Sequence, residues 1–240
     1  MDGPPKRGPD AVEDMKYFSR MVALALLTAL PALGDDWTHL GLDDSRSRAP
    51  VESLGLPLAS SGTATTGIDT VASPAVADGY IVTAGMDGVL RGWRESDRAA
   101  LWSVSLGQPL IASPLVDQGR VFAPCSDGHL YARRLADGSA LWDLQTDGAD
   151  QASPILSGGV LYISSGFPNT KVMAVNPSTG AVVWNFPVDQ ITNSSPAVSG
   201  GRVLAACNSG RLYSINAATG AQVWSIVLGG TVGSSSPLVD

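Results

Sequence analysis

The sequence is poor in the residues that bind metals and attach haem. Its 240 residues include two cysteines and two histidines. It contains neither a Cys-Cys pair nor a Cys-x-x-Cys-His motif, which excludes a vicinal disulfide and the usual haem attachment. His39 and His129 stand alone, so we interpret both as surface residues. The sequence therefore predicts no metal site.

Charged residues are also scarce, at 15% of the chain, and no long run of either sign occurs. The 15 basic and 22 acidic residues give a net charge of −7. Proteins that bind nucleic acid carry a basic patch or stripe. The composition therefore argues against nucleic acid as a partner.

The chain has no apolar run long enough to cross a membrane. Residues 21–33 form a run of about 13 residues, whereas a spanning helix needs roughly 18–20. Lys16 and Arg20 precede this run, and Gly34 ends a small-residue pattern that follows it. A basic start, a short apolar centre and small residues at the end are typical of a secretory signal peptide.

This pattern divides the N-terminal part of the chain. Residues 1–14 are polar and form a candidate artefact of an upstream start codon, and residues 15–34 are the predicted signal peptide. The mature chain is expected to begin near Asp35, in the periplasm or outside the cell. No cysteine follows the apolar run, so no lipid anchor is expected.

Beyond this point, residues 73–240 repeat a single unit. Ser-Pro dipeptides recur at spacings of 40, 40, 42 and 41 residues, and tryptophans keep step with them at 40, 42 and 40. Periods of 40–45 residues with four short strands are the signature of β-propeller blades. The two series are Ser73-Pro74, Ser113-Pro114, Ser153-Pro154, Ser195-Pro196 and Ser236-Pro237, with Trp102, Trp142, Trp184 and Trp224.

Each unit contains four short apolar runs separated by turn residues. In the third unit the runs are 154–156, 160–163, 172–175 and 182–184. They predict a four-stranded antiparallel blade with the proline opening the innermost strand. The tryptophan lies in the outermost strand, where we expect it to cover the seam to the next blade. The turn at 166–169 is two residues longer than its equivalents and is predicted to protrude.

The predicted fold is all-β. Residues 35–70 are a lead-in segment, in which residues 56–66 occupy the place of an outermost closing strand, and residues 71–240 form the propeller. Four complete blades are followed by the first strand of a fifth, which starts at Ser236-Pro237. We therefore expect an incomplete, open propeller.

The repeat resembles the pyrroloquinoline-quinone-like propeller family, whose blade motif is Ala-x-Asp-x-x-Thr-Gly-x-x-x-Trp. Residues 174–184 and 214–224 fit this motif with small substitutions, and the resemblance extends over residues 36–240. The family includes quinoprotein dehydrogenases, the propeller subunit of the outer-membrane-protein assembly machine and secreted proteins without catalytic activity. The resemblance therefore implies the fold and leaves the activity to be argued from the site.

A quinoprotein dehydrogenase of this family needs a calcium held by carboxylate and amide oxygens, together with an aspartate base. Glu52 and Glu95 are the only glutamates after residue 34, and neither has acidic neighbours at calcium-loop spacing. The periodic tryptophans are explained by packing, which leaves Trp93 as a candidate for an exposed contact. No catalytic, cofactor-binding or metal-binding residue is predicted, and no cofactor.

Cys125 and Cys207 occupy equivalent positions in the second strands of blades two and four. A whole blade separates them, whereas a disulfide needs Cα atoms within about 7 Å. We therefore interpret them as two small, partly buried residues.

The favoured hypothesis is an exported, non-catalytic propeller that acts as a protein-binding or envelope-associated scaffold. Its expected partner is another protein of the cell envelope. The alternative is an N-terminal piece of a quinoprotein dehydrogenase that depends on pyrroloquinoline quinone, so whether the protein is an enzyme stays open.

Overall fold

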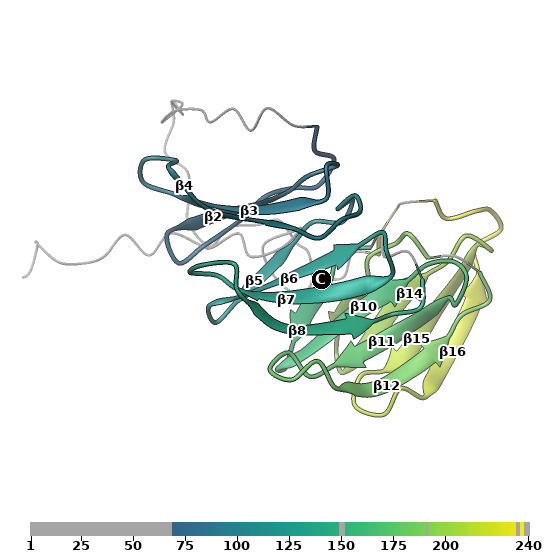
Figure 1. Cartoon of the computed structure of the whole chain (residues 1–240). Helices are drawn as coiled ribbons and strands as arrows, with labels where there is room; N and C mark the ends of the chain where they lie inside the picture. The colour runs from purple at the N-terminus through teal and green to yellow at the C-terminus, as the bar shows by residue number, and fades with distance from the viewer. Residues whose placement is uncertain (1–68, 149–151, 191, 234–235, 238–240) are drawn as a thin grey trace, which may run out of the picture. The chain divides into compact units, whose positions relative to one another are not determined.

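A computed structural model of the chain describes residues 69–148, 152–190, 192–233 and 236–237. The described residues form sixteen strands and no helix (Figure 1). The strands make four separate four-stranded antiparallel sheets, and in each sheet the spatial order follows the order in the sequence. The all-β, four-blade prediction is confirmed. The predicted signal peptide and the lead-in segment up to residue 68 lie outside the described residues.

Each blade is built from four strands in sequence order. Blade 1 comprises β1 (Ala75–Ala77), β2 (Tyr80–Ala84), β3 (Val89–Arg94) and β4 (Ala100–Ser105); blade 2 comprises β5 (Leu115–Asp117), β6 (Arg120–Cys125), β7 (His129–Arg134) and β8 (Ala140–Gln145); blade 3 comprises β9 (Ile155–Ser157), β10 (Val160–Ser165), β11 (Lys171–Val175) and β12 (Val182–Pro187); blade 4 comprises β13 (Ala197–Ser199), β14 (Arg202–Ala206), β15 (Arg211–Asn216) and β16 (Gln222–Val227).

The strands begin and end at slightly different residues than the apolar runs suggested. The first strand of each blade begins one residue after its proline, as β9 does at Ile155, because proline has no N–H to pair. The longer strands continue into polar residues. Ser165 pairs with Lys171, and Lys171 in turn pairs with Pro187, so backbone pairing extends β10 and β12 beyond the apolar stretch.

The outer tryptophan of each blade pairs with a small residue on the third strand. These residues are Gly92, Ala132, Ala174 and Ser214, and a register shift follows each of them. In blade 1 the indole of Trp102 lies so close that a Cβ at position 92 would collide with it. This contact explains the small residue that opens the repeat motif.

The same tryptophans join each blade to the next. Trp184 is 9% exposed, and its indole N–H donates to a carbonyl in the loop that follows the third strand of blade 4. The predicted role of the tryptophans at the seams is therefore confirmed. The three bonds run from Trp102 to Leu135, from Trp142 to Pro177 and from Trp184 to Ala217, with N···O distances of 2.7, 3.1 and 2.9 Å.

The serine of each Ser-Pro dipeptide forms a second link between blades. Its backbone N–H donates to the hydroxyl of the equivalent serine in the next unit, at N···O distances of 2.8–3.0 Å. Three of these side chains are at most 6% exposed, so each bond satisfies a group removed from water. The chain of bonds runs from Ser73 through Ser113, Ser153 and Ser195 to Ser236.

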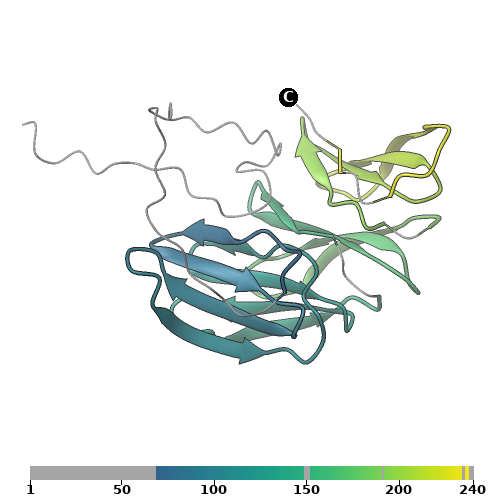
Figure 2. The ribbon, with the colours of Figure 1, turned by 90° about the horizontal axis from the view of Figure 1, so that it is seen from above.

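The hydrophobic core lies between blades as much as within them. One buried cluster joins residues of blades 1 and 2, another joins blades 2 and 3, and a third joins blades 3 and 4. Each blade therefore depends on its neighbours, as in other repeat folds. The four described blades follow one another without closing into a ring (Figure 2), which confirms the predicted open arrangement.

Candidate binding site

The repeat departs from its pattern in the connection between β10 and β11, residues 166–170. The backbone of this loop is fixed by the preceding blade: Pro168 forms an antiparallel bridge with Gly148, and Ser165 Oγ donates to Thr146 O at 3.1 Å. A Cβ at Gly148 would collide with the Gly166 carbonyl, so this close approach requires glycine. The side chain of Phe167 is 69% exposed. The connection is longer than its equivalents, as predicted, at five residues against three or four in the other blades.

A hollow of about 290 Å³ lies beside this loop. Blade 3 contributes the loop itself, the β12–β13 connection contributes two polar residues, and the β14–β15 turn contributes Asn208. The buried Oδ1 of Asn208 accepts no hydrogen bond from the described residues. The lining combines one exposed aromatic ring with several hydrogen-bonding groups and consists of Phe167, Pro168, Thr170, Asp189, Gln190 and Asn208.

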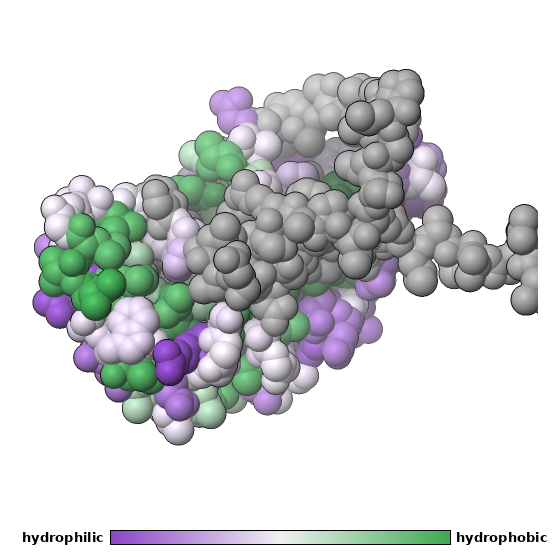
Figure 3. Space-filling model, turned by 180° about the vertical axis from the view of Figure 1, so that it is seen from behind, coloured by the Kyte–Doolittle hydropathy of each residue, from purple (hydrophilic) through white to green (hydrophobic). Residues whose placement is uncertain are grey.

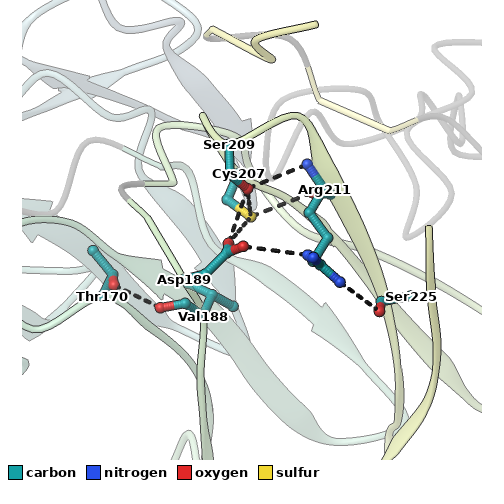
Figure 4. A network of polar contacts seen from close by, with 7 residues as sticks. All are labelled: Thr170, Val188, Asp189, Cys207, Ser209, Arg211 and Ser225. Carbon is teal, nitrogen blue, oxygen red and sulfur yellow. Dashed lines mark hydrogen bonds and ion pairs between the residues drawn. The ribbon is translucent and has the colours of Figure 1, made fainter. Parts of the chain in front are cut away.

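Asp189 is held at this hollow by donors from blade 4 (Figure 4). Its Oδ1 accepts bonds from Ser209 Oγ at 2.9 Å and Cys207 Sγ at 3.1 Å. Its Oδ2 lies 3.2 Å from Arg211 Nε, and Arg211 also donates to Ser225 Oγ at 3.3 Å. The carboxylate is thus oriented from three directions and ties the β12–β13 connection to blade 4.

These contacts determine the protonation of the cluster. Burial acts to raise the pKa of Asp189, but the hydrogen bonds from Cys207 and Ser209 and the charge of Arg211 lower it overall below its ordinary value of 3.8. Burial raises the pKa of the Cys207 thiol. Cys207 therefore stays protonated at neutral pH and serves as a donor to the carboxylate rather than as a nucleophile.

The same arrangement recurs at the preceding seam. Asp147, in the β8–β9 connection, lies 3.1 Å from Lys171 Nζ at the start of β11, just as Asp189 lies beside Arg211 at the start of β15. At the first seam the equivalent base position is His129, whose Nδ1 lies 3.5 Å from its own blade's Asp127. One ion pair thus links blade 3 to the connection that follows blade 2, and a second links blade 4 to the connection that follows blade 3.

The described residues do not fit a calcium-held quinone. Among the described residues, Asp189 is the only carboxylate that lines the hollow, and its two oxygens already accept bonds from Cys207, Ser209 and Arg211. No group of three or more histidine, cysteine or acidic side chains that could hold a metal occurs in the described part of the chain. Calcium takes six to eight oxygen ligands, which this donor set does not supply.

Among the described residues that the sequence singled out, Cys207 reaches this hollow through its bond to Asp189, and the others do not line it. Cys125 and Cys207 are free, and both are at most 1% exposed, so they are more deeply buried than predicted. Burial raises the pKa of Cys125 to about 11. Trp93 is half-buried and donates to Thr83 Oγ1 within its own blade at 3.0 Å. His39 and Glu52 lie outside the described residues, and Glu95 is exposed.

Sequence reasoning missed Asp189 and Arg211. A signal for them was present: Asp147 and Asp189 are 42 residues apart, and Lys171 and Arg211 are 40 apart, which matches the spacing of the blades. Asp147 directly precedes Gly148, a dipeptide typical of turns, whereas Asp189 is followed by Gln190, so the spacing was the signal that the two aspartates share.

Four sheets joined by tryptophan seams and by a chain of serine bonds define a β-propeller built from a tryptophan-ended repeat. The sequence pattern of one family matches residues 58–195 and 168–240. The chain belongs to this family, which is described as outer membrane protein assembly factor BamB. No curated protein matches the chain significantly.

Solved structures share the fold. BamB from Moraxella catarrhalis superposes with a TM-score of 0.63 at 20% identity, covering 69% of this chain and 55% of that one. The quinohaemoprotein alcohol dehydrogenase from Comamonas testosteroni gives 0.67 at 14% identity, with 80% and 41% covered. A europium-containing methanol dehydrogenase gives 0.67 at 11% identity, with 80% and 48% covered. The chain thus spans about half the length of these proteins.

The Asp189 network predicts a dependence of stability on pH. Because the pKa of Asp189 is lowered in the folded state, its ionised form stabilises the fold above pH 3.8, and this contribution is lost as the pH falls further. Asp189→Asn should therefore lower the free energy of unfolding at pH 7, and its difference from the wild type should shrink below pH 3.8. Urea titrations at several pH values measure this, and a constant difference would contradict it.

Proposed function

We propose that the protein is an exported, non-catalytic scaffold that binds another protein of the cell envelope through the 166–170 loop and its hollow. The observation that carries the proposal is the side chain of Phe167, which is 69% exposed beside a hollow where Asn208 Oδ1 accepts no hydrogen bond from the described part of the chain. Aromatic anchors beside hydrogen-bonding groups are typical of protein interfaces.

The position of the loop within the repeat supports this function. In repeat proteins, insertions between otherwise equal units map to loops on one face, which is often the binding face. Here the extra residues of blade 3 form a loop held by a backbone bridge from Pro168 to Gly148 in the β8–β9 connection. A binding loop positioned by a rigid scaffold loses less entropy when it meets a partner.

Envelope location is supported by the N-terminal sequence and by the family. Residues 15–34 have the pattern of a signal peptide, and the family is described by a factor for outer membrane protein assembly. In the described part of the chain, no helix has the length and apolarity to cross a bilayer. Interaction with an envelope protein agrees with these observations.

Photocrosslinking in the cell envelope tests the proposal. A photoreactive phenylalanine at position 167 should give one discrete adduct with an envelope protein. The same residue at position 86 is the matched control, since Met86 is 38% exposed in the equivalent turn of blade 1. Phe167→Ala should then weaken binding of the captured protein by about 30-fold, as expected for an interface anchor worth about 2 kcal/mol.

Two results would contradict the scaffold function. Equal crosslinking from positions 86 and 167 would show that the loop has no special contact. Saturable one-to-one binding of pyrroloquinoline quinone with calcium, measured by calorimetry, would favour the quinoprotein alternative. The superposition on two dehydrogenases is the observation behind that alternative, whereas the paired state of Asp189 argues against it.

A further inference from the structure

The hollow beside the 166–170 loop offers hydrogen-bond acceptors that the described residues leave unused. Asn208 Oδ1 is buried and accepts no hydrogen bond from them. Thr170 Oγ1 donates to Val188 O at 2.9 Å, so its own lone pairs are available to a donor. A buried acceptor without a donor is unfavourable, so a ligand that donates to it gains affinity. The hollow therefore suits a ligand that is rich in donors.

The size of the hollow limits what it can hold. Pockets for whole small molecules usually measure about 300–1,000 Å³. This hollow measures about 290 Å³, which suits a single side chain of a partner better than a cofactor. An exposed apolar group alone does not mark a site, since Figure 3 shows hydrophobic residues gathered on the left of the face that it presents. The hollow is distinguished by the polar groups beside its ring.

The chain holds one of its own arginines with the same kinds of groups. The guanidinium of Arg120 lies over the ring of Phe122, with 5.9 Å between Cζ and the ring centroid. It donates to Asp117 Oδ2 at 2.8 Å, to Gln118 Oε1 at 3.2 Å and to Ser178 Oγ at 2.7 Å. A phenylalanine ring, an aspartate followed by a glutamine, and a hydroxyl thus hold one guanidinium.

The hollow repeats these groups, and no arginine is among the described residues that line it. Phe167 supplies the ring, and Thr170 supplies the hydroxyl. Asp189 and Gln190 are again an aspartate followed by a glutamine. Asn208 adds the amide oxygen that lacks a donor from the described chain. This lining is complementary to a guanidinium, which carries five N–H donors, no acceptor and a flat face that stacks on aromatic rings.

The nearby Arg211 is engaged elsewhere. It pairs with Asp189 and donates to Ser225 Oγ (Figure 4), and its guanidinium lies over the ring of Tyr213 in blade 4. Because Asp189 compensates its charge, Arg211 opposes the entry of a second guanidinium only weakly. The net charge of −7 also favours a basic partner group over an acidic one.

We propose that the hollow is a receptor for an arginine side chain of an envelope protein. The inference rests on the proposed function for the identity of the partner, and it adds the chemistry by which the partner is recognised. The guanidinium stacks on Phe167 and donates to Asn208 Oδ1, Thr170 Oγ1 and the amide oxygen of Gln190. A lysine fits these groups less well, because its compact ammonium has no flat face.

N-acetyl-arginine methylamide is the probe that tests this inference without the partner. Nuclear magnetic resonance titration of the isotope-labelled chain measures its affinity, and the side-chain signals of Asn208 and Phe167 report where it binds. The citrulline probe has the same shape, but it carries an oxygen in place of one nitrogen and has no charge. The arginine probe should bind at least about fivefold more tightly than the citrulline and lysine probes.

Asn208→Asp should bind the arginine probe about fivefold more tightly than the wild type, because the acceptor becomes charged. A folding defect cannot produce such a gain. Asn208→Leu and Phe167→Leu should each weaken binding about fivefold, through loss of a hydrogen bond or of the ring. Ser126→Ala is the matched control, since Ser126 takes the place of Asn208 in the β6–β7 turn and its buried Oγ also lacks a partner among the described residues. It should leave the affinity unchanged.

Equal affinities for the three probes would overturn the proposal, and so would an equal loss in Asn208→Leu and Ser126→Ala. Either result leaves the scaffold function standing, because a discrete adduct from position 167 reports a partner whatever side chain that partner contributes. Binding of the arginine probe as predicted, with no adduct from position 167, would support the guanidinium site and contradict the scaffold function.

Discussion

Replacing Trp184 by alanine should lower the free energy of unfolding by about 3–5 kcal/mol, the range for removal of a buried aromatic side chain. The indole is 9% exposed, donates to Ala217 O at 2.9 Å and packs against Gly220. The substitution removes this packing, opens a cavity at the seam between blades 3 and 4 and leaves the Ala217 carbonyl without that donor. Urea unfolding followed by fluorescence and circular dichroism measures the change.

Trp224→Ala is the control for this experiment. Trp224 occupies the same position of the repeat, but its side chain is partly exposed and no described blade covers it. The free energy of unfolding should fall by no more than about 1 kcal/mol, as for most substitutions outside a packed core. If both variants lost the same free energy, the tryptophans would stabilise their own blades and the seam would contribute little.

Gly180→Ala should lower the free energy of unfolding by about 2–5 kcal/mol. Two effects add: a left-handed backbone costs an L-residue about 1–2 kcal/mol, and overpacking of a tight contact costs about 1–3 kcal/mol. Gly180 has φ +73°, and its added Cβ would lie 2.8 Å from the ring of Trp142. Because the nearest atoms belong to the partly buried ring of Trp142, which lies at the seam, the seam must shift to accommodate the methyl group.

Gly159→Ala separates the two effects. Gly159 lies in the same blade with φ +78°, and a Cβ there would meet nothing within 4 Å. Its substitution should therefore lower the free energy of unfolding only by the penalty for a left-handed backbone, about 1–2 kcal/mol. Urea midpoints of the two variants, compared under one set of conditions, give the difference. Equal losses would mean that contact with Trp142 does not limit position 180.

The fold could be predicted because the repeat presents the same information four times. One tryptophan or one Ser-Pro dipeptide says little, but two series in step define the unit, its strands and its outer edge. The long turn of blade 3 was predictable for the same reason, since it appears as a spacing of 42 among spacings of 40.

The links between blades were harder to predict because they join residues far apart in the sequence. The serine bonds span 40–42 residues, and Asp189 lies 22 residues before Arg211. Hydrophobic periodicity reports which face of a strand is buried, but it contains no information on which polar groups meet across a seam. The serines were therefore treated as neighbours of the prolines, and the acid–base pairs were missed.

In every serine bond the donor N–H precedes its acceptor hydroxyl in the sequence. The donor is therefore synthesised before its acceptor. Each N–H donates to a hydroxyl that lies 40–42 residues later in the chain. At a synthesis rate of about 5–20 residues per second, the acceptor leaves the ribosome about 2–8 seconds after its donor. Each newly made blade thus completes the one before it, and the most recently made blade is always the one with an unsatisfied seam.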